Sequence, residues 1–425
     1  MTIALSQPLS KPNVTDTRQV RLTSRILHIG SAVSKLNPFE YVKTPKFVYL
    51  PDQEELAKAL RQQGRLNDYI GCIERREDIT TLLENTFGED WTKTEGEGGR
   101  PLFPKTLRSL NWANMAITEL HPMIRNGYGH HYIPGSSIKG AIRTAIAYHL
   151  LKHSDRYRVP QTSRISEIEN RLRQSMGDLK RRAKFADDRL FMDELFTNFG
   201  LTYQGREVNS RPGPNTDILR AVLVSDSQPL IEQKIERNGQ RPTFRNLPVV
   251  TETLISSRFP DYKAKYRASI YAEMVFNVRT QFTLSLDHEM LAWFHHKQGM
   301  TLPFESVDDL LRICQDFAQE QWDFEHDYWA TIVNNPNDRG RSLNFDAIKE
   351  LYEPESCPYT LRLGWGSGLR GTTISLCLSD ETVREVRDTC GLRAPGFEAP
   401  KSRRTIMNAR GEISYVPGWV KLEAL

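Results

Sequence analysis

Six segments of the chain have the periodicity of regular secondary structure, and their order restricts the fold. Strand-like alternation occurs at 20–30, 217–227, 273–286 and 372–378, and helical periodicity occurs at 136–150 and 306–322. Pro134 and Gly135 break the chain before the first helical segment, and Ser306 with Asp309 resembles a capping box before the second. The order along the chain is therefore strand, helix, strand, strand, helix, strand.

This order is that of the split βαβ unit, the ferredoxin-like arrangement shared by RNA-recognition folds. We predict an α+β protein whose ferredoxin-like (RRM-like) core occupies residues 18–378, with large insertions at about 31–130 and 153–216. Residues 1–17 contain much Ser, Pro and Thr and are predicted to be a flexible tail. Residues 379–425 are predicted to be a C-terminal extension that packs on the core.

Composition excludes several classes of protein. Of the 425 residues, 39% are hydrophobic and 26% are charged, which is typical of a globular protein. No apolar run is long enough to span a membrane, and the N-terminus lacks the pattern of a secretory signal, so we expect a cytoplasmic protein without a membrane partner. The five cysteines form no C-x-x-C pair, which argues against a zinc ribbon or a disulfide framework.

Basic residues are unevenly distributed, although the net charge is only +4. They concentrate at 139–143, 164–189 and 401–404, whereas residues 308–327 are acidic. Local clusters of Lys and Arg matter more than net charge for binding phosphates, because they displace counterions. The distribution favours a protein with one RNA-binding face and one protein-binding face.

The segment GSSIKG (135–140) superficially resembles a phosphate loop, but Ala141 and Ile142 follow where a Walker A loop needs Lys and then Ser or Thr. A Gly-Ser-Ser turn capped by Ser136 or Ser137 at a helix start still presents backbone N–H groups to an anion. Lys139 and Arg143, four residues apart, lie on one helical face and are candidate RNA ligands. The alternative is an ordinary capped helix with solvated charges.

The segment GSGLRG (366–371) matches the G-x-G-x-x-G pattern. A dinucleotide site requires a helix after this motif, whereas the next residues are strand-like, so that interpretation fails. What remains is a glycine loop that contains Arg370 and that a nucleic-acid backbone could approach closely, or else a plain tight turn. No histidine, cysteine or carboxylate pattern indicates a metal site, and no cofactor is predicted.

Several of these segments together carry a family resemblance. They are LHIG (27–30), YIPGSSIKGAIRTA (132–145), DILRAVLVSD (217–226), Glu273 with the strand after it, LGWGSG (363–368) and PGWVKL (417–422). In this order they resemble the RAMP superfamily of CRISPR-associated proteins, and more narrowly the Csm-type subunit that ends the backbone filament of type III-A effectors. The resemblance covers about residues 20–420.

The resemblance implies an RRM-like fold and a role as a subunit that binds the CRISPR guide RNA. It implies contacts with target RNA and with other RAMP backbone subunits, a place near the 3′ end of the guide, and help in guide maturation by protecting RNA or recruiting host trimming nucleases. The RNA-binding residues that we predict from the motifs and the resemblance together are His28, Gly30, Ser136, Ser137, Lys139, Arg143, Gly364, Gly366, Gly368 and Arg370.

The same resemblance bears on catalysis. Catalytic RAMP backbone subunits carry an aspartate in the loop after the first strand, whereas residues 31–44 contain only one carboxylate, Glu40. We therefore expect a subunit with no catalytic residue. Two alternatives remain open: a metal-dependent ribonuclease that cuts target RNA with Glu40, and a guide-processing endoribonuclease that uses His28 as general acid or base. Cleavage assays with target RNA and with precursor guide RNA would separate the three.

Overall fold

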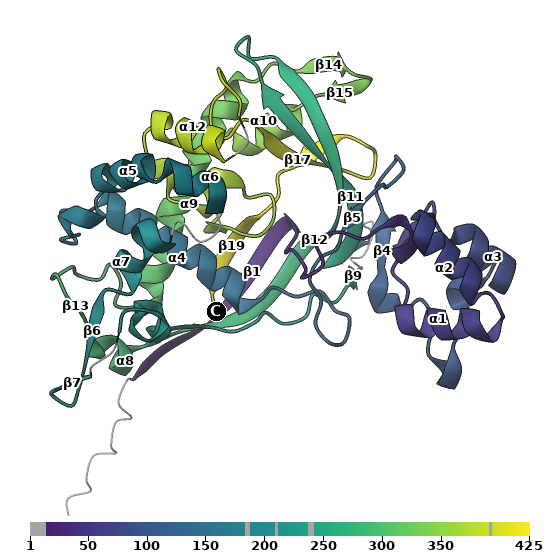
Figure 1. Cartoon of the computed structure of the whole chain (residues 1–425), viewed down its shortest axis with the longest axis horizontal. Coiled ribbons are helices and arrows are strands. Elements are labelled where there is room, and N and C mark those ends of the chain that lie inside the picture. Colours follow the sequence, from purple (N-terminus) through teal and green to yellow (C-terminus); the bar gives the residue numbers. More distant parts are fainter. Residues whose placement is uncertain (1–13, 183–187, 209–210, 237–241, 391–392) are drawn as a thin grey trace, which may run out of the picture.

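The computed structural model describes residues 14–182, 188–208, 211–236, 242–390 and 393–425. It is a mixed α/β structure in which a large, strongly bent sheet runs through the molecule (Figure 1). Helices gather at the left of this view, and a small helical unit lies at the right. No helix in the described part of the chain is long and apolar enough to cross a membrane.

In the described residues, twelve strands form the large sheet. They are β1 (Thr15–Leu27), β2 (Val42–Lys43), β3 (Phe47–Tyr49), β4 (Arg108–Asn111), β5 (Leu120–His121), β8 (Val222–Val224), β11 (Leu247–Arg258), β12 (Ala264–Asp287), β16 (Leu361–Arg362), β17 (Arg403–Met407), β18 (Ile413–Tyr415) and β19 (Trp419–Ala424). The main path is β16-β19-β1-β12-β11-β4-β3-β2. Its central strands β19, β1, β12 and β11 are antiparallel to one another.

Smaller strand groups flank this sheet. They are β9 (Gln233–Ile235) with β10 (Thr243–Arg245), β6 (Phe199–Tyr203) with β7 (Arg206–Val208) and β13 (Phe294–His296), and β14 (Asn335–Asp338) with β15 (Arg341–Leu343). The helices are α1 (Gln53–Gln62), α2 (Leu66–Arg75), α3 (Thr80–Phe87), α4 (Gly135–Lys152), α5 (Ile165–Gln174), α6 (Met176–Arg182), α7 (Asp193–Phe196), α8 (His288–Trp293), α9 (Val307–Thr331), α10 (Asp346–Tyr352), α11 (Gly368–Thr372) and α12 (Asp380–Thr389).

The two long helices α4 and α9 cover one face of the central strands. In α4 the residues repeating every four positions, Ile138, Ile142, Ile146 and Leu150, are all buried in one apolar cluster with the even-numbered residues Val20 and Leu22 of β1. The start of α9 is fixed as expected, because the Ser306 hydroxyl accepts a hydrogen bond from the Asp309 N–H at 3.1 Å. The helices thus leave the face of β1 that carries Gln19, Arg21 and Thr23 uncovered by this core.

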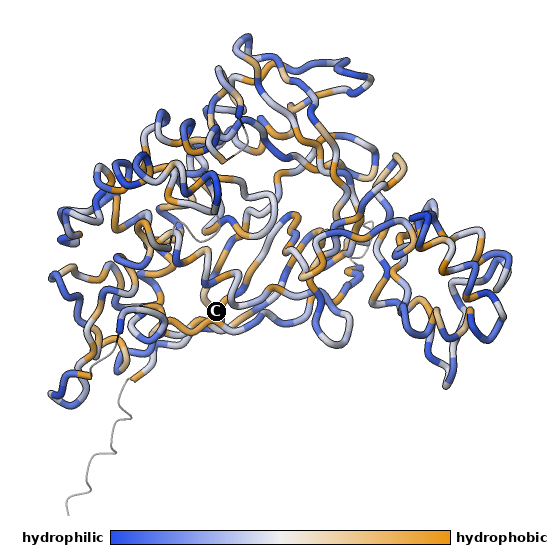
Figure 2. Tube along the Cα trace, viewed as in Figure 1, coloured by the Kyte–Doolittle hydropathy of each residue, from blue (hydrophilic) through white to orange (hydrophobic). Residues whose placement is uncertain are grey.

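The helical unit α1–α3 belongs to the predicted insertion after the first strand and has an apolar core of its own, which includes Leu56, Leu60 and Trp91. Its first helix is capped by Asp52, whose carboxylate accepts from the Glu55 N–H. The sequence DQEELAKALRQQG, with Asp52 as cap and Gly64 at its end, predicts this helix. Figure 2 shows that α5, α6 and α12, at the upper left, are largely hydrophilic, in keeping with their many charged residues.

Three expected strand positions are wrong. The first strand begins at Thr15, so it includes residues assigned to the tail; residues 1–13 of that tail lie outside the described residues. The segment 217–227 contains a 3-10 turn (Ile218–Ala221) and only the short strand β8, and the long strand before β12 is β11. The segment 372–378 holds the end of α11 and another 3-10 turn, because Thr373 and Ser375 hydrogen-bond back to Leu369.

The strand that pairs with the free edge of β1 is β19, from the segment predicted to be a C-terminal extension. The alternation of buried and exposed residues at 419–424 is too short to predict a core strand. Only the pairing with β1 shows that β19 belongs to the central sheet. The division of the chain into tail, core and extension stays a prediction. Its first boundary lies earlier than predicted, because β1 begins at Thr15.

Candidate nucleic-acid interface

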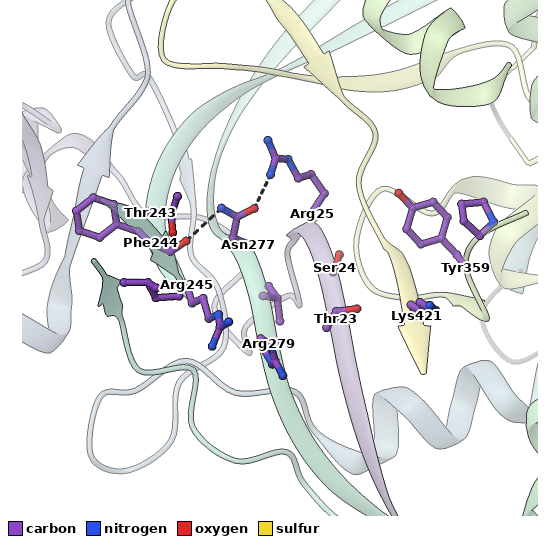
Figure 3. Close-up of a pocket in the computed structure, with 13 residues that line it drawn as sticks. Thr23, Ser24, Arg25, Thr243, Phe244, Arg245, Asn277, Arg279, Tyr359 and Lys421 are labelled. Atoms are coloured by element: carbon purple, nitrogen blue, oxygen red, sulfur yellow. Dashed lines mark hydrogen bonds between the residues drawn. The ribbon is translucent and has the colours of Figure 1, made fainter. Parts of the chain in front are cut away.

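A groove of about 490 Å³ lies on the sheet face that α4 and α9 leave open (Figure 3). We call it the sheet-face groove. It is lined by Thr23, Ser24, Arg25, Ile235, Thr243, Phe244, Arg245, Asn277, Val278, Arg279, Pro358, Tyr359 and Lys421. The floor comes from β1, β12 and β19, and one wall comes from the β9–β10 pair.

The strand register assembles the floor of the groove. Thr23 pairs with Lys421 of β19 on one side and with Arg279 of β12 on the other, so these three side chains form a row across three adjacent strands. Side chains alternate between faces along a strand, so the exposed Arg25, two residues on, lies on the same face as Thr23. The buried Leu22 points to the opposite face, into the apolar cluster that α4 and α9 share.

Two linked hydrogen bonds run across the floor and reach the wall. The Arg25 guanidinium donates to Asn277 Oδ1 at 2.7 Å, and Asn277 Nδ2 donates to the Phe244 carbonyl at 3.1 Å (Figure 3). Arg25 also lies over the Phe276 ring at 4.5 Å from its centroid. These contacts hold β10 beside the sheet and fix the direction of the Arg25 side chain.

The groove is cationic. Arg25, Arg245, Arg279 and Lys421 line it, and none of its described lining residues is acidic. Cations along a groove bind phosphates without reading the base sequence, and the rings of Phe244 and Tyr359 offer surfaces on which bases can stack. This arrangement can hold a single-stranded nucleic acid by its backbone.

The predicted site at the start of α4 differs from expectation. Neither Ser136 nor Ser137 caps the helix; instead the Gly135 N–H donates to Asp226 Oδ1 at 2.7 Å. A side chain at Gly135 would overlap the Val224 carbonyl, so this glycine allows the loop after β8 to approach the helix. The prediction of a serine cap is wrong because the carboxylate of Asp226, which is distant in sequence, already binds the N-terminus of the helix. Ser136 is exposed and Ser137 is partly exposed.

The two basic residues of α4 that are predicted to bind RNA, Lys139 and Arg143, are not both free. The Arg143 guanidinium forms an ion pair with Asp217 at 2.5 Å and lies over the Phe196 ring at 4.1 Å. The expectation that its charged head is free to reach phosphates is therefore wrong. Lys139 is partly buried, and this burial lowers its pKa, while Asp217 opposes the shift. Lys139 remains a candidate RNA ligand, and the binding role of both residues stays a prediction.

The structure brings His28 and the glycine loop together. The Trp365 N–H donates to the His28 carbonyl at 2.9 Å, and side chains at Gly364 and Gly366 would collide with the His28 carbonyl and with Pro417. Two of the predicted glycines therefore serve packing inside the protein. Gly368 has a φ of 74°, and a Cβ at this residue would meet no atom within 4 Å. Of the three predicted loop glycines, Gly368 is thus the one that leaves room for a ligand.

Arg370 is a structural residue. It is 5% exposed, pairs with Asp380 at 2.7 Å, donates to the Ala399 carbonyl at 3.2 Å and lies over the Phe324 ring. The expectation that this loop arginine is free to reach RNA is wrong, because a carboxylate and backbone carbonyls already surround the guanidinium.

His28 and Gly30 lie at the end of β1. The His28 ring is 2% exposed, its Nδ1–H donates to the Glu273 carbonyl at 2.6 Å, and burial lowers its pKa to about 4. Gly30 forms an isolated bridge with Met123 and is exposed. Glu273 itself is buried and accepts hydrogen bonds from Arg125, the Ser109 hydroxyl and the Met123 N–H. His28 and Glu273 thus tie the end of β1 to β12 and to the segments that carry Ser109, Met123 and Arg125.

Three arginines of the basic run at 164–189 form ion pairs with carboxylates. Arg164 pairs with Asp155, Arg171 with Glu194, and Arg173 with Glu385. These three arginines are therefore not free cations.

Sequence reasoning missed the groove arginines and Lys421. A partial signal exists, since Arg21, Thr23 and Arg25 alternate with buried residues in β1 and Asn277 and Arg279 do so in β12. That pattern marks an open sheet face. It does not reveal that cations from positions 25, 279 and 421 share one groove.

Comparisons with known proteins agree on a family. The RAMP superfamily model matches residues 20–355. The chain is 27% identical over 154 residues to the CRISPR system Cms protein Csm5 of Enterococcus italicus, covering 30% of this chain and 44% of the relative. It is 30% identical over 134 residues to the Csm5 protein of Streptococcus thermophilus, covering 29% and 36%. Each match therefore spans less than half of the curated relative.

Two solved structures resemble the whole chain. A chain of a type III-A Csm–crRNA–target RNA ternary complex superposes with a TM-score of 0.61 at 23% identity, over 96% of this chain and 100% of that one. The T. onnurineus Csm5 crystal structure gives 0.53 at 18% identity, over 95% and 100%. These two likenesses show the fold. Because the family model matches most of the sequence, this chain belongs to the RAMP superfamily.

Proposed function

We propose that this chain is a structural subunit of a type III CRISPR effector ribonucleoprotein and that it binds guide RNA. In this proposal it caps the backbone of the complex near the 3′ end of the guide and assists guide maturation, as part of antiviral defence in the cytoplasm. The observation that carries the proposal is the sheet-face groove, in which Arg25, Arg245, Arg279 and Lys421 line an uncovered sheet beside two aromatic rings.

The core topology supports RNA binding on this face. The strand order β19-β1-β12-β11, with α4 between β1 and β11 and α9 between β12 and β19, matches the antiparallel order of a ferredoxin-like βαββαβ unit. RNA-recognition folds of this kind bind single strands on the sheet face opposite the helices. The groove lies on that face.

A non-catalytic role is supported by the surroundings of the two candidate catalytic residues. The Glu40 carboxylate accepts hydrogen bonds from the backbone and side chain of Asn37 at 2.8 and 2.9 Å, which fixes it in a 3-10 turn. The His28 ring is buried between β12 and the glycine loop. Both side chains have structural partners, so we favour binding over either ribonuclease activity.

The proposed partners are guide RNA, target RNA and neighbouring RAMP subunits, with host trimming nucleases as a further partner. The similar solved chain comes from a complex that contains crRNA and target RNA, which supports the first three. Copurification from the native host, followed by mass spectrometry and RNA sequencing, would test them. Recovery only as an RNA-free monomer would contradict the proposal.

The sharpest test is direct binding of single-stranded RNA to the purified chain. The double variant Arg245→Ala, Arg279→Ala removes two cations from the groove without opening the apolar core. We expect about a tenfold loss of affinity or more near 0.1 M salt, because each lost phosphate contact forfeits counterion release.

A matched control is the variant Arg75→Ala, Arg312→Ala, which removes the same charge from exposed positions on α2 and α9. We expect its affinity to change by about twofold or less. Equal losses in both variants would show that the groove is not the binding surface. Metal-dependent cleavage of target RNA that Glu40→Gln abolishes, or cleavage of precursor guide RNA that His28→Gln abolishes, would instead establish a ribonuclease.

A further inference from the structure

A second cavity, also of about 490 Å³, lies behind the glycine loop and shares no lining residue with the sheet-face groove. We call it the arginine chamber. Its walls include Glu325 and Trp329 of α9, Arg362 of β16, Gly366 and Gly368 of the glycine loop, and Lys401, Arg403 and Arg404 at the start of β17.

The chamber holds more positive than negative charge. Arg362 and Arg403 both pair with the carboxylate of Glu325, at 3.6 and 3.0 Å, and all three residues are buried. Glu325 is the single acidic residue among the described residues that line the chamber, so one carboxylate faces two guanidiniums. Lys401 and Arg404 add further cations at the same wall.

Two guanidinium nitrogens there have no hydrogen-bond partner among the described residues. One is Nη2 of Arg403, a residue that is only 5% exposed, and the other is Nε of Arg404. Burial lowers the pKa of Arg404, and the nearby charge of Arg362 lowers it further. Buried donors are normally satisfied, so unpaired cationic donors beside a cavity indicate an anion that the chain itself does not supply.

We propose that the arginine chamber binds the phosphate group of a nucleotide. Planar guanidinium forks match phosphate oxygens and bind them in a bidentate manner. The chamber is larger than a phosphate alone needs and falls in the size range of small-molecule sites. Leu369, Val386 and Val416 give it apolar walls for the sugar or base.

The nucleotide can come from two sources with the same chemistry: a free nucleoside monophosphate, or the phosphorylated end of an RNA strand. The second source rests on the proposed function. The first does not, so binding at the chamber can be measured even if the sheet-face groove binds no RNA.

The test is calorimetric titration of the full chain with uridine monophosphate, inorganic phosphate and uridine. We expect the monophosphate to bind, phosphate to bind more weakly, and uridine not to bind. Arg404→Gln should weaken monophosphate binding at least tenfold, because it removes a cation whose buried Nε has no partner. Uridine binding as tightly as its monophosphate, or unchanged binding by Arg404→Gln, would overturn the proposal.

Arg403→Lys is the second variant, because it keeps a cation beside Glu325 and loses the fork that carries the unpaired Nη2. It should also weaken monophosphate binding, while the groove variant Arg245→Ala, Arg279→Ala should bind the monophosphate normally. Loss of monophosphate binding in that groove variant alone would overturn the assignment to the chamber.

RNA of one sequence with a 3′-phosphate, with a 3′-hydroxyl, with a 5′-phosphate and in circular form separates the sources. If the chamber takes a strand end, Arg404→Gln lowers the affinity for one phosphorylated end and leaves circular RNA unaffected. If the chamber binds free nucleotides, Arg404→Gln should bind all four RNAs with the affinity of the wild type, while its affinity for uridine monophosphate is still reduced. Failure of every RNA to bind the wild type would count against the proposed function and not against the chamber.

Discussion

Gly364 packs directly against the main-chain carbonyl of His28, so closely that a Cβ at residue 364 would overlap the carbonyl oxygen. The φ of Gly364 is also 76°, a conformation that side chains disfavour. This contact joins the glycine loop to the end of β1. The loop is thereby held on the sheet that carries the proposed RNA groove.

The first prediction concerns this contact. Gly364→Ala should lower the free energy of unfolding by about 2–4 kcal/mol, because it adds a collision to the backbone strain. Gly368→Ala is the control, since its φ is 74° and its Cβ would meet nothing within 4 Å. It should cost about 1–2 kcal/mol. Urea denaturation measures both, and equal losses would show that the contact with His28 adds nothing.

The second prediction concerns Arg143 and Asp217. Their ion pair is mostly buried, with side chains 21% and 20% exposed, so Arg143→Ala should destabilise the fold by about 1–3 kcal/mol. Lys139→Ala should stay within about 0.5 kcal/mol. A double-mutant cycle with Asp217→Asn should give a coupling energy of about 1 kcal/mol or more. Additive effects would show that the pair is not a stabilising unit.

The third prediction is a pH dependence from His28. Burial lowers the pKa of its ring to about 4, whereas an unfolded histidine titrates near 6.5. Between these values the unfolded chain holds the extra proton, so this contribution to stability is complete above about pH 6.5 and is lost as the pH falls toward 4. The loss is about 3 kcal/mol at most.

His28→Gln should flatten this dependence, which urea midpoints at pH 7, 6, 5 and 4.5 will show. His149, whose pKa burial also lowers to about 4, contributes in the same direction and should keep part of the slope in that variant. Parallel curves for the wild type and His28→Gln would mean that His28 takes up its proton at the same pH in both states.

The fourth prediction concerns the kind of RNA binding. A cationic groove contacts phosphates, so affinity should fall steeply with salt and depend little on base sequence. The slope of log affinity against log salt should shrink by about one to two units in Arg245→Ala, Arg279→Ala. Fluorescence anisotropy at several salt concentrations measures this. A flat salt dependence, or a strong preference for one base, would contradict backbone binding in the groove.

Local patterns determined the elements that depend on neighbouring residues. The sequence predicted the strand that became β1, the helices α1, α4 and α9, and the alternation of β12. The caps at Asp52 and Ser306 were predicted correctly because a cap involves residues three apart. Periodicity and capping act within a few residues, so they can be read without knowing the fold.

Tertiary structure alone decided which of the predicted RNA-binding cations have carboxylate partners. Arg143 and Arg370 look like free cations in the sequence, but the fold places Asp217 and Asp380 against them. In the sheet-face groove, by contrast, the fold brings cations together, because the strand register places Lys421 and Arg279 on either side of Thr23. Ion pairing and cross-strand neighbours join residues separated by tens to hundreds of positions, and only the folded chain brings them within reach of one another.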